Sequence, residues 1–184
     1  MSPIRRSVLA AAGPAMACAA GLAASSTATT TRSDLASEQD VDELVLRATQ
    51  AHEALMRGDQ RRYRALVPYA DDFTLMTPFG GKPSRGGQLS DERWEQIGRF
   101  FRDGRDSTLE LVQAYRSADL VVLAAIERTH VQVGDIPAQD WALRVTLVFR
   151  KDRGQWLLVH RHADALAGGI SVAQAALLAR GPKA

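Results

Sequence analysis

Cysteine is almost absent from this chain, which has a single one, Cys18, among its 184 residues. If the segment that carries Cys18 is removed, the remaining protein has no thiol. It then has no disulfide, no cysteine-ligated metal and no cysteine nucleophile. A lipid anchor on Cys18 is the alternative, but Ala15, three residues earlier, is smaller than the aliphatic residue usual in lipoprotein signals.

An excess of charge of one sign is also lacking. The chain has 23 lysines and arginines against 21 aspartates and glutamates. Arg5 and Arg6 lie in the first 28 residues, which contain no aspartate or glutamate. The rest of the chain therefore has 21 basic and 21 acidic residues. Nucleic-acid binding needs a clustered positive excess, so we predict no nucleic-acid partner.

No apolar run is long enough to cross a membrane. After Arg5-Arg6, an alanine-rich run extends to Leu22 and is interrupted by Gly13-Pro14, whereas a membrane span needs about 20 apolar residues. Paired arginines, a short apolar run and small residues up to Ala28 are typical of a twin-arginine export signal. We therefore predict an extracytoplasmic protein, periplasmic or secreted, with no stable span in the mature chain.

The chain divides into four predicted segments. Residues 1–28 are the export signal, and the Ser/Thr/Ala-rich residues 29–36 form a disordered linker. Residues 37–166 form one domain, and residues 167–184 form a carboxyl-terminal helix and tail.

Helical periodicity marks the first half of the domain. Ser37-Glu-Gln-Asp40 matches a capping box, and apolar residues then recur at helical spacing until Gly58. Asp59 can cap a second, short helix that ends before Pro68. A third helix is expected over residues 91–104, ending at Gly104.

Alternating, strand-like runs mark the second half. A short strand is expected over residues 73–76, and a terminal helix over 171–179. Short turns separate the four long strands, which indicates antiparallel neighbours. The predicted class is α+β, with a curved antiparallel sheet wrapped around the N-terminal helices to leave a cone that can hold a ligand. The four long strands are expected over 108–115, 120–133, 140–150 and 155–162.

Three segments resemble a known superfamily. They are Tyr69–Gly86, the strand ending in Glu127-Arg-Thr-His130, and Phe149–Asp164. Together they resemble the nuclear transport factor 2-like superfamily over residues 38–165, especially its snoaL-like and ketosteroid-isomerase-like branch. The third segment is also similar to the end of the calcium/calmodulin-dependent kinase association domain. The resemblance implies a cone-shaped, cystatin-like roll, a fold that hosts isomerases, dehydratases, cyclases, hydrolases and assembly domains.

The catalytic acids of ketosteroid isomerases are missing from this chain. The resemblance places that family's general base at Thr77, and a hydroxyl cannot replace a carboxylate as a proton-shuttling base. It places the oxyanion tyrosine near Ala51 or His52, and the second oxyanion acid near Thr146. Steroid isomerisation by that mechanism is therefore not expected.

Histidine and arginine in the predicted elements supply other polar candidates. His52 lies on or beside the apolar stripe of the first helix, as either a core histidine or a pocket acid/base. The two-residue period of a strand places Trp156, Leu158, His160 and His162 on one face. These two histidines could be structural, line the pocket, or bind a metal if Glu127 or His130 supplied a third ligand. We predict no metal and no cofactor.

An arginine in the middle of an apolar strand needs a partner if it is buried. Arg144 is such a residue, with Glu127 or Asp164 as the plausible partner, and we expect a buried Arg144–Glu127 pair. The pair can be structural or can clamp an anionic ligand.

The sequence therefore predicts that the cone binds a small, largely apolar or weakly anionic molecule, either in cofactor-free acid/base catalysis or as a non-catalytic carrier or assembly domain. A homodimer through the open sheet face is expected. The candidate catalytic residues are His52, Glu127, Arg144 and His160. The candidate ligand-binding residues are Phe73, Met76, Thr77, Trp94, Phe101, His130, Trp141, Thr146 and His162.

Overall fold

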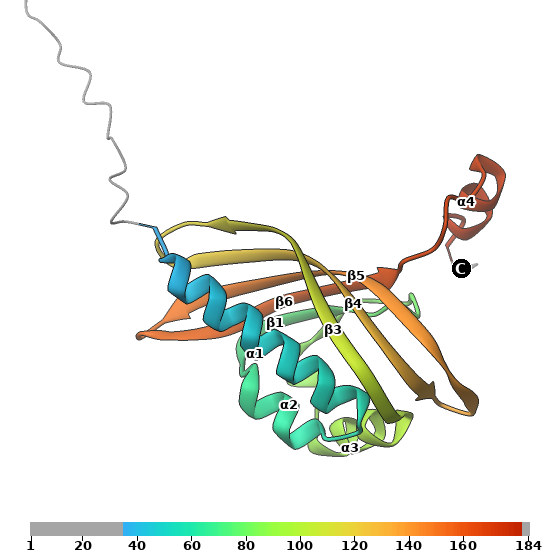
Figure 1. Cartoon of the computed structure of the whole chain (residues 1–184), viewed down its shortest axis with the longest axis horizontal. Coiled ribbons are helices and arrows are strands. Elements are labelled where there is room, and N and C mark those ends of the chain that lie inside the picture. The colour runs from blue at the N-terminus through green and yellow to red at the C-terminus, as the bar shows by residue number, and fades with distance from the viewer. Residues whose placement is uncertain (1–34, 182–184) are drawn as a thin grey trace, which may run out of the picture.

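A computed structural model describes residues 35–181 of the chain. Its longest helix, α1 (Glu38–Met56), lies across the sheet in Figure 1. The predicted capping box is confirmed, because the Ser37 hydroxyl accepts from the Asp40 N–H and the Asp40 carboxylate accepts from the Ser37 N–H. The predicted export signal lies outside the described residues, as does most of the predicted linker.

Two shorter helices complete the helical layer. Helix α2 (Gln60–Leu66) begins after the predicted cap Asp59, and α3 (Asp91–Phe100) begins after Ser90. The prediction that the third helix continues to Gly104 is wrong, because the chain is already in strand β3 (Phe101–Arg116). A Cβ on Gly104 would lie 2.6 Å from both the carbonyl oxygen and the Cβ of Met56. This glycine therefore allows β3 to cross α1 closely and does not end a helix.

Within residues 35–181, six strands form one sheet in the order β2-β1-β6-β5-β4-β3. Short β2 (Ser84–Arg85) and β1 (Tyr69–Met76) form one edge. Strands β4 (Leu120–Val133), β5 (Ile136–Asp152) and β6 (Gln155–Ala165) follow β3 as the predicted antiparallel meander. Strand β1 runs parallel to β6. The α+β class and the cone-shaped sheet are confirmed.

The sheet curves around α1, so its concave face encloses the core (Figure 1). Alternate residues of β4 from Val121 to Val133 are buried on this face, as are those of β5 from Leu143 to Phe149. The residues between them point to the convex face, which α1, α2 and α3 leave uncovered in Figure 1. One face of these strands therefore packs on the core, and the other is left uncovered by the helices.

A β-bulge in β6 changes which residues face the core. Phe149 of β5 pairs with Leu158, but Val148 pairs with His160, so Val159 is an extra residue without a partner in the register. After a bulge, the alternation of side chains continues in the opposite phase. Arg161 is therefore buried on the concave face, while His160 points to the convex face.

The predicted terminal helix is present as α4 (Val172–Leu178), capped by Ser171. Figure 1 shows it standing apart from the rest of the molecule. None of its residues is buried. No helix within residues 35–181 is both long and apolar enough to cross a membrane.

Candidate functional site

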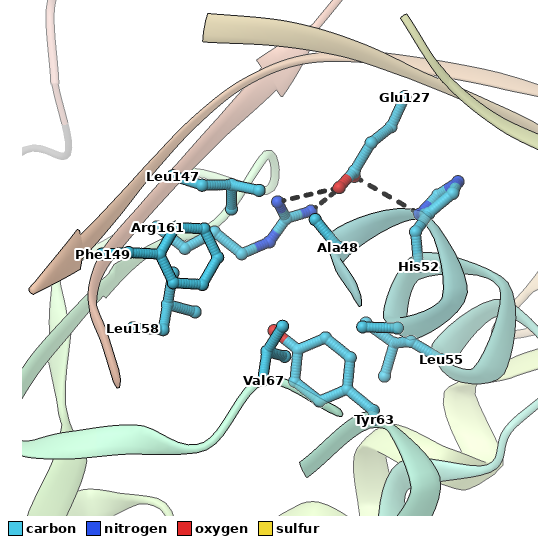
Figure 2. A pocket seen from close by; sticks show the side chains of 11 residues that line it. Ala48, His52, Leu55, Tyr63, Val67, Glu127, Leu147, Phe149, Leu158 and Arg161 are labelled. Carbon is cyan, nitrogen blue, oxygen red and sulfur yellow. Dashed lines mark hydrogen bonds and ion pairs between the residues drawn. The ribbon is translucent and has the colours of Figure 1, made fainter. Parts of the chain in front are cut away.

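Three charged or titratable side chains meet inside the cone. His52 comes from α1, Glu127 from β4 and Arg161 from β6, and all three are buried. Figure 2 shows the Arg161 guanidinium and the His52 ring approaching the Glu127 carboxylate from two sides. We call these three residues the polar centre.

The ion pair at this centre is bidentate. Arg161 Nη2 donates to Glu127 Oε2 at 2.7 Å, and Nη1 donates to Oε1 at 3.3 Å. The relative exposure is 3% for Glu127 and 8% for Arg161. Such burial removes both charges from water, so the Glu127 carboxylate depends on Arg161 to remain ionised.

The environment of Glu127 keeps its carboxylate ionised. Burial alone would raise its pKa, but the nearby charge of Arg161, and then that of His52, outweigh burial and lower the pKa below its ordinary value. A carboxylate with a lowered pKa is a poor proton acceptor at neutral pH. Glu127 is therefore better suited to orient and balance its two neighbours than to shuttle protons.

Both ring nitrogens of His52 lie near oxygen acceptors. Nδ1 is 3.4 Å from Glu127 Oε2, although this contact lacks hydrogen-bond geometry. Nε2 is 3.3 Å from the backbone oxygen of Arg128. Imidazole is the side chain that exchanges protons near neutral pH. The ring is therefore held by one hydrogen-bond contact, at Nε2, while its buried Nδ1 faces the Glu127 carboxylate without a hydrogen bond.

A small cavity adjoins the polar centre. Its volume is about 10 Å³, the space of a single water molecule. Tyr63 of α2 contributes to the opposite wall, and burial raises the pKa of its hydroxyl, which therefore stays protonated as a potential donor. The remaining lining is apolar, from α1, the end of α2 and the sheet: Ala48, Ala51, Leu55, Val67, Leu147, Phe149 and Leu158.

The expected Arg144–Glu127 pair is wrong. Arg144 pairs in register with Ile126, so its side chain lies on the convex face, opposite to that of Glu127. It is exposed and forms a bidentate ion pair with the Asp164 carboxylate. Asp164, the other partner considered, is therefore the correct one, and Arg161 takes the place expected for Arg144.

The structure does not bring the other polar candidates into the cone. His160 lies on the convex face with Nδ1 2.8 Å from Thr74 Oγ1; burial lowers its pKa, and the neighbouring His162 lowers it further. Thr146 and His162 are register partners on the same face. His130, 3.0 Å from the Asp140 carboxylate, lines a separate hollow of about 320 Å³.

The predicted apolar lining also lies elsewhere. Phe73 and Trp94 are buried in the core. Phe101 and Trp141 are partly buried and pack against it, and Met76 is exposed. None of these five lines the cavity at the polar centre.

Thr77 lies in the loop that follows β1, where its hydroxyl is 3.5 Å from the Gly80 carbonyl oxygen. It does not line the cavity at the polar centre. Within residues 35–181, no three histidine, cysteine, aspartate or glutamate residues cluster as a metal site would require.

Arg161 and Tyr63 were missed as members of the site. Strict alternation along residues 155–162 assigned Arg161 to the wrong face because a one-residue bulge leaves no mark in a hydrophobic pattern. A signal for Tyr63 was present: Tyr63 and Val67 are four residues apart, so both fall on one face of the short helix.

Comparisons with known proteins agree with this architecture. A family model described as a SnoaL-like domain matches residues 47–167. No curated protein sequence matches the chain.

Several solved structures share the fold. A proposed dehydratase of the NTF2-like family from Streptomyces avermitilis is 19% identical, with a TM-score of 0.58 over 72% of this chain and 100% of the other. An NTF2-like superfamily protein from Salmonella enterica is 18% identical, with a TM-score of 0.56 over 73% and 94%. A proposed calcium/calmodulin-dependent protein kinase II association domain from Xanthomonas campestris is 20% identical, with a TM-score of 0.50 over 71% and 89%. At these identities the likeness concerns the fold alone.

Proposed function

Because the chain belongs to the SnoaL-like domain family of the NTF2-like superfamily, we propose that its cone binds a small, largely apolar molecule at the polar centre and transforms it by cofactor-free acid/base chemistry. The observation that carries this proposal is the convergence of His52, Glu127 and Arg161 on one small cavity. A buried ion pair is weak support for stability as such. Titratable groups with displaced pKa values in an apolar enclosure are more typical of functional sites.

The roles within the polar centre follow from its electrostatics. His52 moves the proton, because Glu127 is held as a carboxylate by Arg161. Glu127 orients the His52 ring and stabilises it when it is protonated. The guanidinium of Arg161 and the protonated hydroxyl of Tyr63 stabilise negative charge that develops on the ligand.

Space limits the ligand in this conformation. A cavity of about 10 Å³ holds a water molecule or one polar atom of a ligand. Helix α2 spans seven residues, and Tyr63 is its one buried residue. We propose that a ligand enters by displacing α2, because this is the wall segment with the least buried surface to lose.

A second candidate function is a non-catalytic carrier or dimeric assembly domain. The observation that favours it is the nearly filled cone beside an uncovered convex face (Figure 1). We propose a homodimer through this face in either case. The catalytic and the assembly functions then differ in whether a ligand binds at the polar centre.

Export by the twin-arginine route remains part of the proposal. Replacing Arg5-Arg6 by Lys-Lys should retain the precursor inside the cell, because the receptor of this route reads both guanidinium groups. Normal export of the variant would contradict the twin-arginine assignment.

Ligand binding is tested by nuclear magnetic resonance titration with a panel of aliphatic and aromatic ketones and carboxylates of six to twelve carbons. We expect saturable shifts at Tyr63 and at the α1 and β4 residues of the cavity wall. Arg161→Lys should weaken binding of the carboxylates, whereas the convex-face control Arg144→Lys should not. Shifts confined to the convex face, or an absence of saturable shifts across the panel, would contradict the proposal and favour an assembly domain.

A further inference from the structure

Helices α2 and α3 each bury a single side chain, and these two side chains pack on each other. Tyr63 is the one buried residue of α2, and Trp94 is the one buried residue of α3. Their ring centroids lie 5.5 Å apart. Figure 1 shows the two helices together on the same side of α1. Displacing either helix therefore disturbs the buried side chain of the other.

The two helices also meet at a shared joint. Helix α2 begins two residues after Gly58, and α3 ends two residues after Gly98. A Cβ on Gly58 would lie 2.5 Å from the Gly98 carbonyl oxygen, and a Cβ on Gly98 would lie 2.8 Å from the Gly58 carbonyl oxygen. Only a pair of glycines allows the two backbones to come this close. The first turn of α2 and the last turn of α3 therefore share one pivot.

An ion pair joins the two helices at the other end. Arg64 of α2 donates at 2.7 Å to the carboxylate of Asp91, in the first turn of α3. The Arg64 guanidinium also lies over the Trp94 ring, 5.6 Å from its centroid. Both partners of the ion pair reach solvent, so water screens it and the ring contacts contribute more to holding the helices together. Helix α2 is therefore joined to α3 along its length.

A buried polar atom favours opening at the shared joint. Gln60 is the first residue of α2, and its side-chain oxygen is buried without a hydrogen-bond partner among residues 35–181. A Cβ on Gly98 would lie 3.2 Å from the Gln60 Cγ, which places this side chain at the contact with α3. An unsatisfied buried acceptor costs free energy that is recovered when the atom reaches water. Opening at the joint therefore relieves a penalty of the closed arrangement.

We propose that α2 and α3 open as one lid over the polar centre, turning about the contact between Gly58 and Gly98. This inference rests on the proposed entry of a ligand by displacement of α2, and it adds that α3 moves with α2. If α2 moved alone, it would lose its ring contact and its ion pair with α3. Opening takes the Tyr63 hydroxyl away from the cavity wall, and closing returns it as a donor. The lid therefore controls both access to the polar centre and the donors that a ligand meets there.

Hydrogen exchange of the ligand-free, full-length chain tests the lid. Amide protons of α2 and α3 should be equally protected from exchange, and less protected than those of α1 and β4. Ala65→Gly weakens α2 at an exposed position, so it should raise exchange in α2 by about twofold to fivefold. Exchange in α3 should rise by the same factor. The control Ala176→Gly, the same change in α4, should leave both helices unaffected, because α4 has no buried residue.

Two results would overturn the lid. If Ala65→Gly raises exchange in α2 and leaves α3 unchanged, the two helices open separately. If the amides of α3 exchange as slowly as those of α1 and β4, α2 opens while α3 stays closed. Both results come from the protein without a ligand, so they leave the proposed chemistry to the ligand titration. Joint opening in a chain that binds no member of the ketone and carboxylate panel would support the lid and contradict the proposed chemistry.

Discussion

The concave and convex faces of the sheet carry the same chemical pair in opposite surroundings. Arg161–Glu127 on the concave face and Arg144–Asp164 on the convex face are both bidentate arginine–carboxylate pairs. The side-chain exposures are 10% and 4% for the concave pair, against 63% and 44% for the convex pair. Water therefore screens the Arg144–Asp164 pair and is excluded from the Arg161–Glu127 pair. Two similar ion pairs are therefore expected to contribute differently to the free energy of unfolding.

The largest effect is expected from breaking the concave pair on one side. Arg161→Met leaves Glu127 buried without a cation, and the free energy of unfolding should fall by about 3–5 kcal/mol. Urea denaturation followed by circular dichroism measures this loss. If Arg161→Met does not fold, Arg161→Lys, which keeps the charge but loses the bidentate geometry, should show a smaller loss in the same direction. A stability equal to that of the wild type would contradict burial of the pair.

Lowering the pH is expected to have a smaller effect, on the stability difference between Arg161→Met and the wild type. The pKa of Glu127 is lowered in the folded state, so its ionic contribution to stability is present above the pKa of the unfolded chain and is lost as pH falls through the folded pKa. In Arg161→Met, the charge of Arg161 no longer opposes the effect of burial. The pKa of Glu127 therefore rises, and Glu127 takes up a proton more easily. The stability deficit of the variant should therefore shrink between pH 7 and pH 4. Urea denaturation at both pH values measures the change, and a constant deficit would show that Glu127 is not its cause.

No measurable steroid isomerisation is expected. The sequence resemblance places the catalytic base of ketosteroid isomerases at Thr77, which does not line the cavity at the polar centre. An ultraviolet assay with a Δ5-3-ketosteroid should show no rate above background. Thr77→Asp is a companion variant that should add little rate, because residue 77 does not line the cavity that Arg161 and Tyr63 line. Clear activity of the unmodified protein would contradict the assignment of Thr77 to the position of the catalytic base.

Local signals in the sequence were sufficient for most of the fold. The capping box at Ser37–Asp40 and the alternation of β4 predict their elements because backbone hydrogen bonding and burial act over a few residues. Gly104 was misread, since its sequence context resembles a helix end while its actual role, close passage of β3 over Met56, depends on tertiary contact.

The candidate site was predicted less well, for a physical reason. His52 and Glu127 were found because each is a polar residue within a regular apolar pattern. Arg144 was expected in the cone because it interrupts an apolar strand, and Arg161 was not considered. Strict alternation places Arg161 on the face opposite Trp156 and Leu158, and the bulge at Val159 inverts this. One unpaired residue therefore brings Arg161 into the cone and leaves His160 on the outside.

The most direct test of this account is a pair of double-mutant cycles, one on each face, measured by urea denaturation. The concave cycle uses Arg161→Met and Glu127→Leu, and the convex cycle uses Arg144→Met and Asp164→Leu. We predict a large favourable coupling for Arg161–Glu127, with the double variant recovering most of the loss of Arg161→Met. The coupling of Arg144–Asp164 should be indistinguishable from zero. Equal couplings in the two cycles, or additive losses on the concave face, would contradict a buried polar centre within the cone.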